Sequence, residues 1–174
     1  MASVIRGSDN FDTATVGITS GTSVATTSGT SIDFTGIPAG IKLITVMLSG
    51  VSTNGSSEII FRMGTVGGVQ ATGYLSTGAV VAGGVVAANE TTGFRIVNNG
   101  GVATDIKNGI LSLALLNDAT GIWSASGSFG HSNSARLNLL GGSKTLSGTL
   151  DRIRLTTVNG TDTFDAGSIN ILYE

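Results

Sequence analysis

Cysteine is absent from this chain of 174 residues, and proline, histidine and tryptophan each occur only once. Without cysteine there can be no disulfide framework, no thiolate nucleophile and no cysteine-ligated metal site. A single histidine also rules out a proton shuttle between two imidazoles. The redox compartment is not encoded, because a chain without cysteine folds equally well in oxidising and reducing surroundings.

Charge is scarce as well. Charged residues make up 11% of the chain and the formal net charge is -2, whereas an average soluble protein has roughly 25% charged residues. Nine basic residues in a nearly neutral chain make a poor electrostatic trap for nucleic acid, so nucleic acid is not an expected partner.

Targeting and membrane signals are missing too. Residues 1–10 include one arginine but no apolar run of the length that a signal peptide needs. The most apolar stretch of low charge, residues 79–88, is about half as long as a membrane span and contains two glycines. We therefore expect a soluble protein that does not insert into membranes.

Small and hydroxylated residues dominate what is present, since glycine, threonine and serine account for 70 of the 174 residues. Mean hydropathy is +0.34. A domain of this size exposes much of its surface, and a surface with few charges suits contact with other protein. The composition favours a subunit that buries part of its exterior in an assembly. The alternative is a monomer kept in solution by its hydroxyls and amides.

Short apolar or alternating runs recur along the chain, while no window keeps the apolar stripe of a helix. Turn clusters separate these runs, and the cluster at 117–121 is typical of a hairpin loop. Such a pattern predicts an all-β fold, an antiparallel β-sandwich that is jelly-roll-like, with nine or ten strands. The clearest predicted strands are residues 41–48, 58–63, 93–97, 110–116, 122–129, 152–158 and 168–173.

Two segments differ from this pattern. Residues 1–29 are predicted to be an extended N-terminal arm that serves as an anchor, and residues 30–174 a single β-sandwich domain. Within the arm, residues 13–30 favour either edge strands that pair only in an assembly or a mobile tail. Residues 66–88 are rich in glycine, alanine and valine, which predicts a long loop or thin edge strands.

No motif indicates catalysis, a cofactor or a metal. Lys144 follows serine instead of the glycine of a phosphate loop, and the stretch leads into a strand. His131, the only imidazole, stands in a polar stretch typical of an exposed loop, and no serine occupies a nucleophile elbow. The aspartates, Asp105 and Asp162 among them, fall in apparent turns, where they bond to the backbone. Calcium binding by residues 159–165 is the weaker alternative to turn bonding. We expect a protein that is not an enzyme and holds neither cofactor nor metal.

Contact residues are harder to predict. Trp123 has a ring that could stack on a sugar, although its place in a predicted strand favours burial in the core. His131, Asn133 and Arg136 share one polar loop. These four residues form a predicted contact surface.

The C-terminal third carries the most distinctive pattern. Residues 143–174 combine an alternating strand, an Asn-Gly-Thr-Asp turn and a closing strand. This segment, together with residues 30–46 and 50–55, resembles the corresponding parts of tailed-bacteriophage virion surface proteins, the tail-fibre tips and small stand-alone fibre or decoration proteins. The resemblance spans roughly residues 29 to 174 and is weakest over residues 66–108.

The resemblance implies a structural protein of a bacteriophage virion that forms a homotrimer and is assembled in the host cytoplasm. It implies a β-domain of the tail-fibre or receptor-binding type that contacts the host surface, with a host cell-surface glycan as the candidate ligand. The alternative is a capsid decoration, a head fibre or cement protein, or an adaptor that stabilises the particle. In either case the N-terminal arm would join the domain to other virion proteins.

Overall fold

A computed structural model describes residues 17–98 and 100–174, which form fourteen strands and no helix. None of the described residues belongs to a helix able to cross a bilayer. The all-β prediction is confirmed, although the predicted number of strands, nine or ten, was too low. The strands are β1 (Thr19–Ser20), β2 (Val24–Ala25), β3 (Ser31–Phe34), β4 (Leu43–Thr53), β5 (Ile59–Thr65), β6 (Gly68–Val69), β7 (Tyr74–Val81), β8 (Val85–Glu90), β9 (Phe94–Arg95), β10 (Lys107–Asn117), β11 (Ile122–His131), β12 (Leu137–Thr145), β13 (Arg152–Thr157) and β14 (Phe164–Tyr173).

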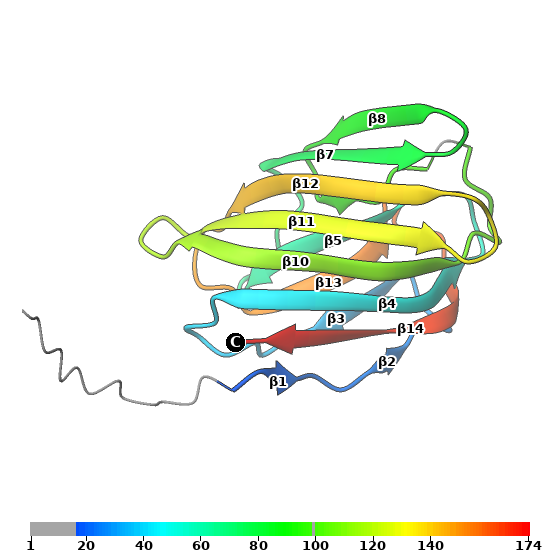
Figure 1. Cartoon of the computed structure of the whole chain (residues 1–174). Coiled ribbons are helices and arrows are strands. Elements are labelled where there is room, and N and C mark those ends of the chain that lie inside the picture. The colour runs from blue at the N-terminus through cyan, green and yellow to red at the C-terminus, as the bar shows by residue number, and fades with distance from the viewer. Residues whose placement is uncertain (1–16, 99) are drawn as a thin grey trace, which may run out of the picture.

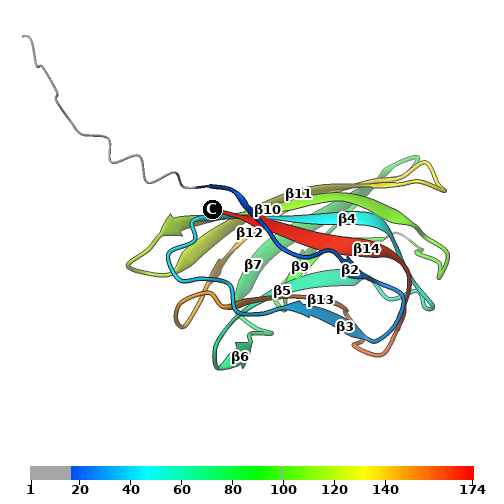
Figure 2. The ribbon, with the colours of Figure 1, turned by 90° about the horizontal axis from the view of Figure 1, so that it is seen from below.

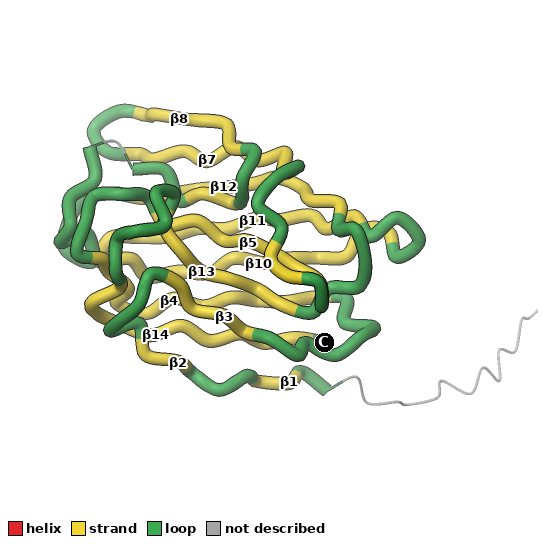
Figure 3. Tube along the Cα trace, turned by 180° about the vertical axis from the view of Figure 1, so that it is seen from behind, coloured by secondary structure: helices red, strands yellow, loops and turns green. Residues whose placement is uncertain are grey.

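Two antiparallel sheets lie face to face (Figures 1 and 2). The larger has nine strands in the order β1-β14-β4-β10-β11-β12-β7-β8, with β2 also paired to β14. The smaller has five strands in the order β3-β13-β5-β6, with β9 also paired to β5, and covers one side of the larger (Figure 3). The predicted antiparallel β-sandwich is thus confirmed, and the jelly-roll detail is not.

Alternation along the strands builds the core. On β4, Ile44, Val46 and Leu48 are buried while the residues between them are half-buried, because successive side chains of a strand point to opposite faces. Phe61 of β5 and Phe129 of β11 stack across the two sheets with their ring centroids 5.6 Å apart. Such an aromatic pair adds about 1 kcal/mol to the free energy gained by burying its area.

The predicted hairpin is present. Strands β10 and β11 pair from Lys107↔His131 to Asn117↔Ile122. Residues 118–121 turn between them, and Gly121 has a φ of 64°, which favours glycine. Every predicted strand overlaps an observed one.

The prediction for residues 66–88 was only partly right. This segment contains β6, β7 and most of β8, and β7 is an interior strand between β12 and β8. Tyr74, Ser76 and Val80 of β7 are buried. Only β8 is the thin edge strand that the composition predicted. Tertiary pairing with β12 outweighs the weak strand propensity of glycine, alanine and serine.

The described part of the predicted arm lies along the opposite edge of the larger sheet. There β1 and β2 pair with β14 of the same chain. The amide of Thr26 donates to the carbonyl of Gly167 at 2.9 Å, and Thr26 is fully buried. Pairing therefore occurs within one chain, and the prediction that these strands pair only in an assembly was wrong. Residues 1–16 of the arm lie outside the described residues.

Candidate functional site

His131 is the last residue of β11, and its side chain is buried between the sheets. The prediction of an exposed loop histidine was wrong. The Nε2 atom lies 2.7 Å from Oδ1 of Asn138, which is fully buried on β12. Asn138 in turn donates its Nδ2 hydrogen to the carbonyl of Val97. Burial is tolerated because these hydrogen bonds satisfy the polar atoms.

These bonds settle the tautomer of the imidazole. Because the amide nitrogen of Asn138 donates to Val97, its oxygen faces His131 and accepts, so Nε2 carries the hydrogen. Burial lowers the pKa of His131 below its ordinary value, and this outweighs the opposing effect of the Asn138 bond. The ring is therefore neutral near pH 7, and its bare Nδ1 accepts from the Ser134 hydroxyl at 3.3 Å.

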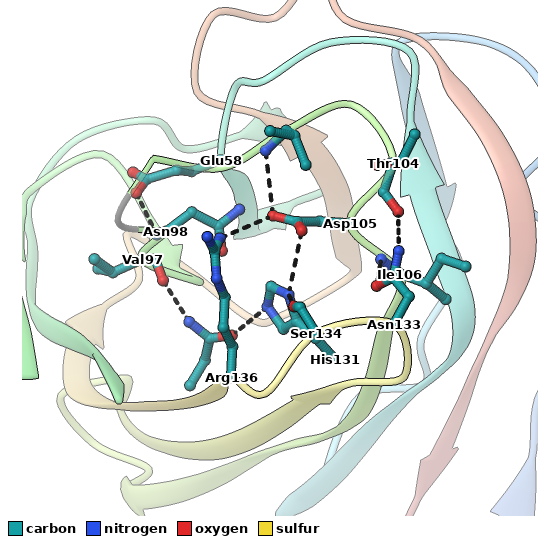
Figure 4. A network of polar contacts seen from close by, with 12 residues as sticks. Glu58, Val97, Asn98, Thr104, Asp105, Ile106, His131, Asn133, Ser134 and Arg136 are labelled. Atoms are coloured by element: carbon teal, nitrogen blue, oxygen red, sulfur yellow. Dashed lines mark hydrogen bonds and ion pairs between the residues drawn. The ribbon is translucent and has the colours of Figure 1, made fainter. Parts of the chain in front are cut away.

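Asp105 is the charged centre of this region (Figure 4). It is 4% exposed, and its Oδ2 lies 3.3 Å from Nη1 of Arg136 while its Oδ1 lies 3.7 Å from Nδ1 of His131. Lys107 is buried nearby, and desolvation lowers its pKa while the Asp105 charge opposes that shift. The buried carboxylate thus offsets part of the cost of burying basic groups.

The grouping of serine, histidine and aspartate does not form a hydrolytic relay. Such a relay needs the carboxylate on one ring nitrogen and the hydroxyl on the other. Here Ser134 and Asp105 both face Nδ1, and Asn138 occupies Nε2. The arrangement holds a loop in place rather than activating a nucleophile.

Asn133 ties the same loop to the start of β10. Its Oδ1 accepts from the amide of Ile106 at 3.1 Å, and its Nδ2 donates to the carbonyl of Thr104 at 2.5 Å (Figure 4). The structure thus brings His131, Asn133 and Arg136 together around residues 104–107. We call these three residues with Asp105 and Asn138 the polar cluster.

Trp123 lies at the other end of β11, eight positions and roughly 27 Å along the strand from His131. It is 3% exposed and belongs to the core. The preference for burial is confirmed, and Trp123 does not share a surface with the polar cluster. A cavity of about 320 Å³ lies beside the hairpin loop, with Trp123, Leu115 and Leu150 among its lining residues.

The remaining polar motifs make local bonds. Among the described residues no group of three or more histidine, cysteine, aspartate or glutamate side chains is placed to hold a metal. Asn159 accepts from the amides of Thr161 and Asp162, at 3.0 and 3.2 Å, which is the turn bonding that competed with calcium. Lys144 lies on β12, buried with its ammonium 5.3 Å from the ring centroid of Tyr74.

The outer face of the larger sheet has an unusual composition. On the five neighbouring strands β10, β11, β12, β7 and β8, none of the outward-pointing residues is charged. Both lysines on these strands, Lys107 and Lys144, point inward and are buried. This is the reverse of the usual sheet, whose solvent face holds the charges.

Two parts can be distinguished on this face. The first, which we call the serine face, lies on β10, β11 and β12, where Ser126 sits between Ser112 and Gly141 in register. Short hydroxyl side chains occupy its centre, and the exposed side chain of Ile110 lies beside Ser128. Its members are Ser112, Ser124, Ser126, Ser128 and Ser143.

The second part, which we call the aliphatic edge, continues from the serine face across β12 and β7 to β8. Leu137 is in register with Val81, and Val81 with Val85. These side chains are well exposed, Val85 at 70% and Leu139 at 47%. Exposed aliphatic groups gathered on neighbouring strands mark a contact surface. The members of the aliphatic edge are Val81, Val85, Leu137 and Leu139.

Sequence reasoning missed the roles of Asp105 and Asn138 in the polar cluster, and it missed both parts of the outer face. On β12 the leucines on either side of Asn138 point outward and Asn138 points inward. This is the reverse of the usual alternation, in which apolar residues face the core, so the local pattern did not indicate that Asn138 is buried. Comparisons with known protein families, with curated proteins and with solved structures find no match for this chain.

Proposed function

We propose that this protein is a bacteriophage virion structural protein, a non-enzymatic β-domain of the tail-fibre or receptor-binding type that contacts the host surface through its serine face. The resemblance of residues 29 to 174 to virion surface proteins supports the phage assignment. The uncharged outer face of the larger sheet is the single observation that supports a contact role.

The chemistry of the serine face fits a neutral glycan. Hydroxyl groups both donate and accept hydrogen bonds, as sugar hydroxyls do. Ser124, Ser126 and Ser128 are exposed on the middle of the sheet, and serine loses little rotamer freedom on binding. With no charged side chain on these strands facing outward, binding to a neutral surface desolvates no ion.

Cell binding and adsorption test this proposal. We expect the purified protein to bind host cells and to slow phage adsorption, with little dependence on salt because no exposed charge takes part. Ser126→Glu, which places a carboxylate at the centre of the serine face, should abolish both effects. Thr120→Glu, on the exposed hairpin loop, is the matched control and should bind normally. Binding no better than that of an unrelated β-protein would overturn the proposal.

The second candidate is a capsid decoration or an adaptor that stabilises the particle. The aliphatic edge favours it, because exposed valine and leucine suit burial against protein better than contact with sugar. Particles lacking the protein should then lose heat or osmotic stability and adsorb normally. Unchanged particle stability would count against this candidate.

Partners and location follow from the same proposal. The protein would lie on the virion, on the tail or the head, after assembly in the host cytoplasm. The N-terminal arm would join it to other virion proteins. Copies of the chain would also associate, and the oligomeric state that the resemblance implies is a homotrimer.

A further inference from the structure

Strand β8 forms an open edge of the larger sheet (Figure 1). It pairs with β7 from Ser76↔Glu90 to Val81↔Val85 without a bulge. On its other side no strand of the described residues follows it. An edge strand presents alternating amide and carbonyl groups that can pair with another strand.

Other edges of the sandwich are protected in ways that β8 is not. At the far end of the same sheet, β1 and β2 have two residues each and are separated by a break, so they present no continuous ladder. In the smaller sheet the edge strand β3 displays Asp33, which pairs with Arg154 at 2.6 Å. Short strands and charges are the usual means of blocking edge pairing.

None of these means operates on β8. Its six residues contain no proline and no lysine, and Glu90 is its only charged residue. That carboxylate is already engaged, because Oε1 accepts from the amides of Thr91 and Thr92 at 2.9 Å and Oε2 lies 3.5 Å from Arg95. Val85 and Val86, on opposite faces of the strand, are 70% and 40% exposed. The carbonyl of Asn89 accepts a hydrogen bond from Arg95 at 3.5 Å. The rest of the strand leaves backbone and apolar groups open to solvent.

We propose that β8 of one chain pairs antiparallel with β8 of a second copy, so that two larger sheets join edge to edge across a two-fold axis. This goes beyond the virion role, because it concerns how two copies meet and does not depend on where the protein is located. The contact is isologous, meaning that the same strand serves on both sides.

Register and charge select a second copy as the partner. Outward residues must face outward residues, so the two-fold axis passes through Ala87 or Ala88. With Ala87 at the centre, Val85 lies opposite Asn89 and Val86 opposite Ala88. The small central residues let the strands approach, and no two like charges face each other. Because the outward residues of β8 are uncharged on both copies, neither loses an ion pair on contact.

Cysteine cross-linking tests this pairing directly, since the chain has no cysteine of its own. Directly opposed residues of an antiparallel pair have Cα atoms about 5 Å apart, which suits a disulfide. Under mild oxidation, Ala87→Cys should form a disulfide-linked dimer with itself, or Ala88→Cys should do so if the axis lies there. Thr120→Cys, on the exposed hairpin loop, is the control and should form no disulfide-linked dimer.

Solution mass gives the second readout. By light scattering we expect two copies, or six where the homotrimer implied by the resemblance also forms. Ala87→Lys, which adds a charge to an exposed edge position, should halve that number without changing the circular dichroism spectrum of the folded protein. A monomeric protein without cross-links at either alanine would overturn the inference. So would a wild-type trimer, because three copies cannot all pair in twos through β8. These mass and cross-linking results do not affect the host-binding test of Ser126→Glu. The β8 pairing and the host-contact proposal can therefore be refuted independently.

Discussion

The imidazole Nε2 of His131 lies 2.7 Å from Oδ1 of Asn138, and this buried contact joins β11 to β12 at one end of the sandwich. Asn138 extends the link to the segment after β9 through the carbonyl of Val97. One amide side chain thus forms hydrogen bonds with buried polar groups on two separate parts of the fold.

Replacing Asn138 with alanine should destabilise the protein. The change leaves the His131 Nε2 hydrogen and the Val97 carbonyl without partners in the interior, which should lower the free energy of unfolding by about 2 to 4 kcal/mol. Urea denaturation measures this loss. Ser128→Ala, on the exposed face of the neighbouring strand, should change it by less than about 0.5 kcal/mol. Equal effects of the two changes would contradict a bonding role for Asn138.

Stability should fall in mild acid because of His131. Burial lowers its folded-state pKa below the unfolded value of about 6.5, so the unfolded chain binds the proton more readily. The stabilising contribution is complete above pH 6.5 and is lost as pH falls through the lowered folded-state pKa. The charged groups near the ring are Asp105, Lys107 and Arg136.

Denaturation of the wild type and of His131→Gln across pH 7.5 to 5 checks this. The free energy of unfolding of the wild type should fall relative to that of the variant as the pH drops. Parallel pH profiles for the two proteins would show that the ring titrates as freely in the folded chain as in the unfolded one.

Gly167 should not tolerate a side chain. It lies at an irregularity in the pairing of β14 with β4, with a φ of 90°. A Cβ atom there would meet the backbone of Gly50 and, at 2.6 Å, the carbonyl oxygen of Ser49. Gly167→Ala should therefore cost at least about 2 kcal/mol of unfolding free energy. Gly84→Ala, at a position with open space around it, should have little effect, and a similar loss there would refute the steric reason.

Trp123 should matter for folding and not for host contact. Its ring is 3% exposed within the core, so Trp123→Ala should lower the free energy of unfolding by about 3 to 5 kcal/mol. At a temperature where the variant is still folded, its binding to host cells should equal that of the wild type. Selective loss of binding by the folded variant would place the ring in the contact surface.

The fold was largely predictable because its central strands have strong local patterns. Residues 41–48 and 152–158 combine β-branched residues with alternation, and they became β4 and β13. Strand β7 was harder to predict because its glycine, alanine and serine have weak strand propensity. Its place in the sheet depends on β12 and β8, and the register between distant strands cannot be read from a local window.

The polar cluster was only half predictable. His131, Asn133 and Arg136 were grouped because they are close in sequence, and the structure keeps them together. Their partners Asp105 and Val97 come from other parts of the chain, so sequence proximity could not reveal that the imidazole is buried. Trp123 was separated from the group because β11 is long enough to carry its two ends to opposite ends of the sandwich.

Immunogold electron microscopy of the parent phage, with antibody raised against this protein, tests the virion assignment most directly. We predict gold at the tail tip or on the fibres. Gold over the capsid would instead support the decoration role and direct attention to particle stability. Particles that bind no gold at any position would contradict the assignment of this chain to the virion.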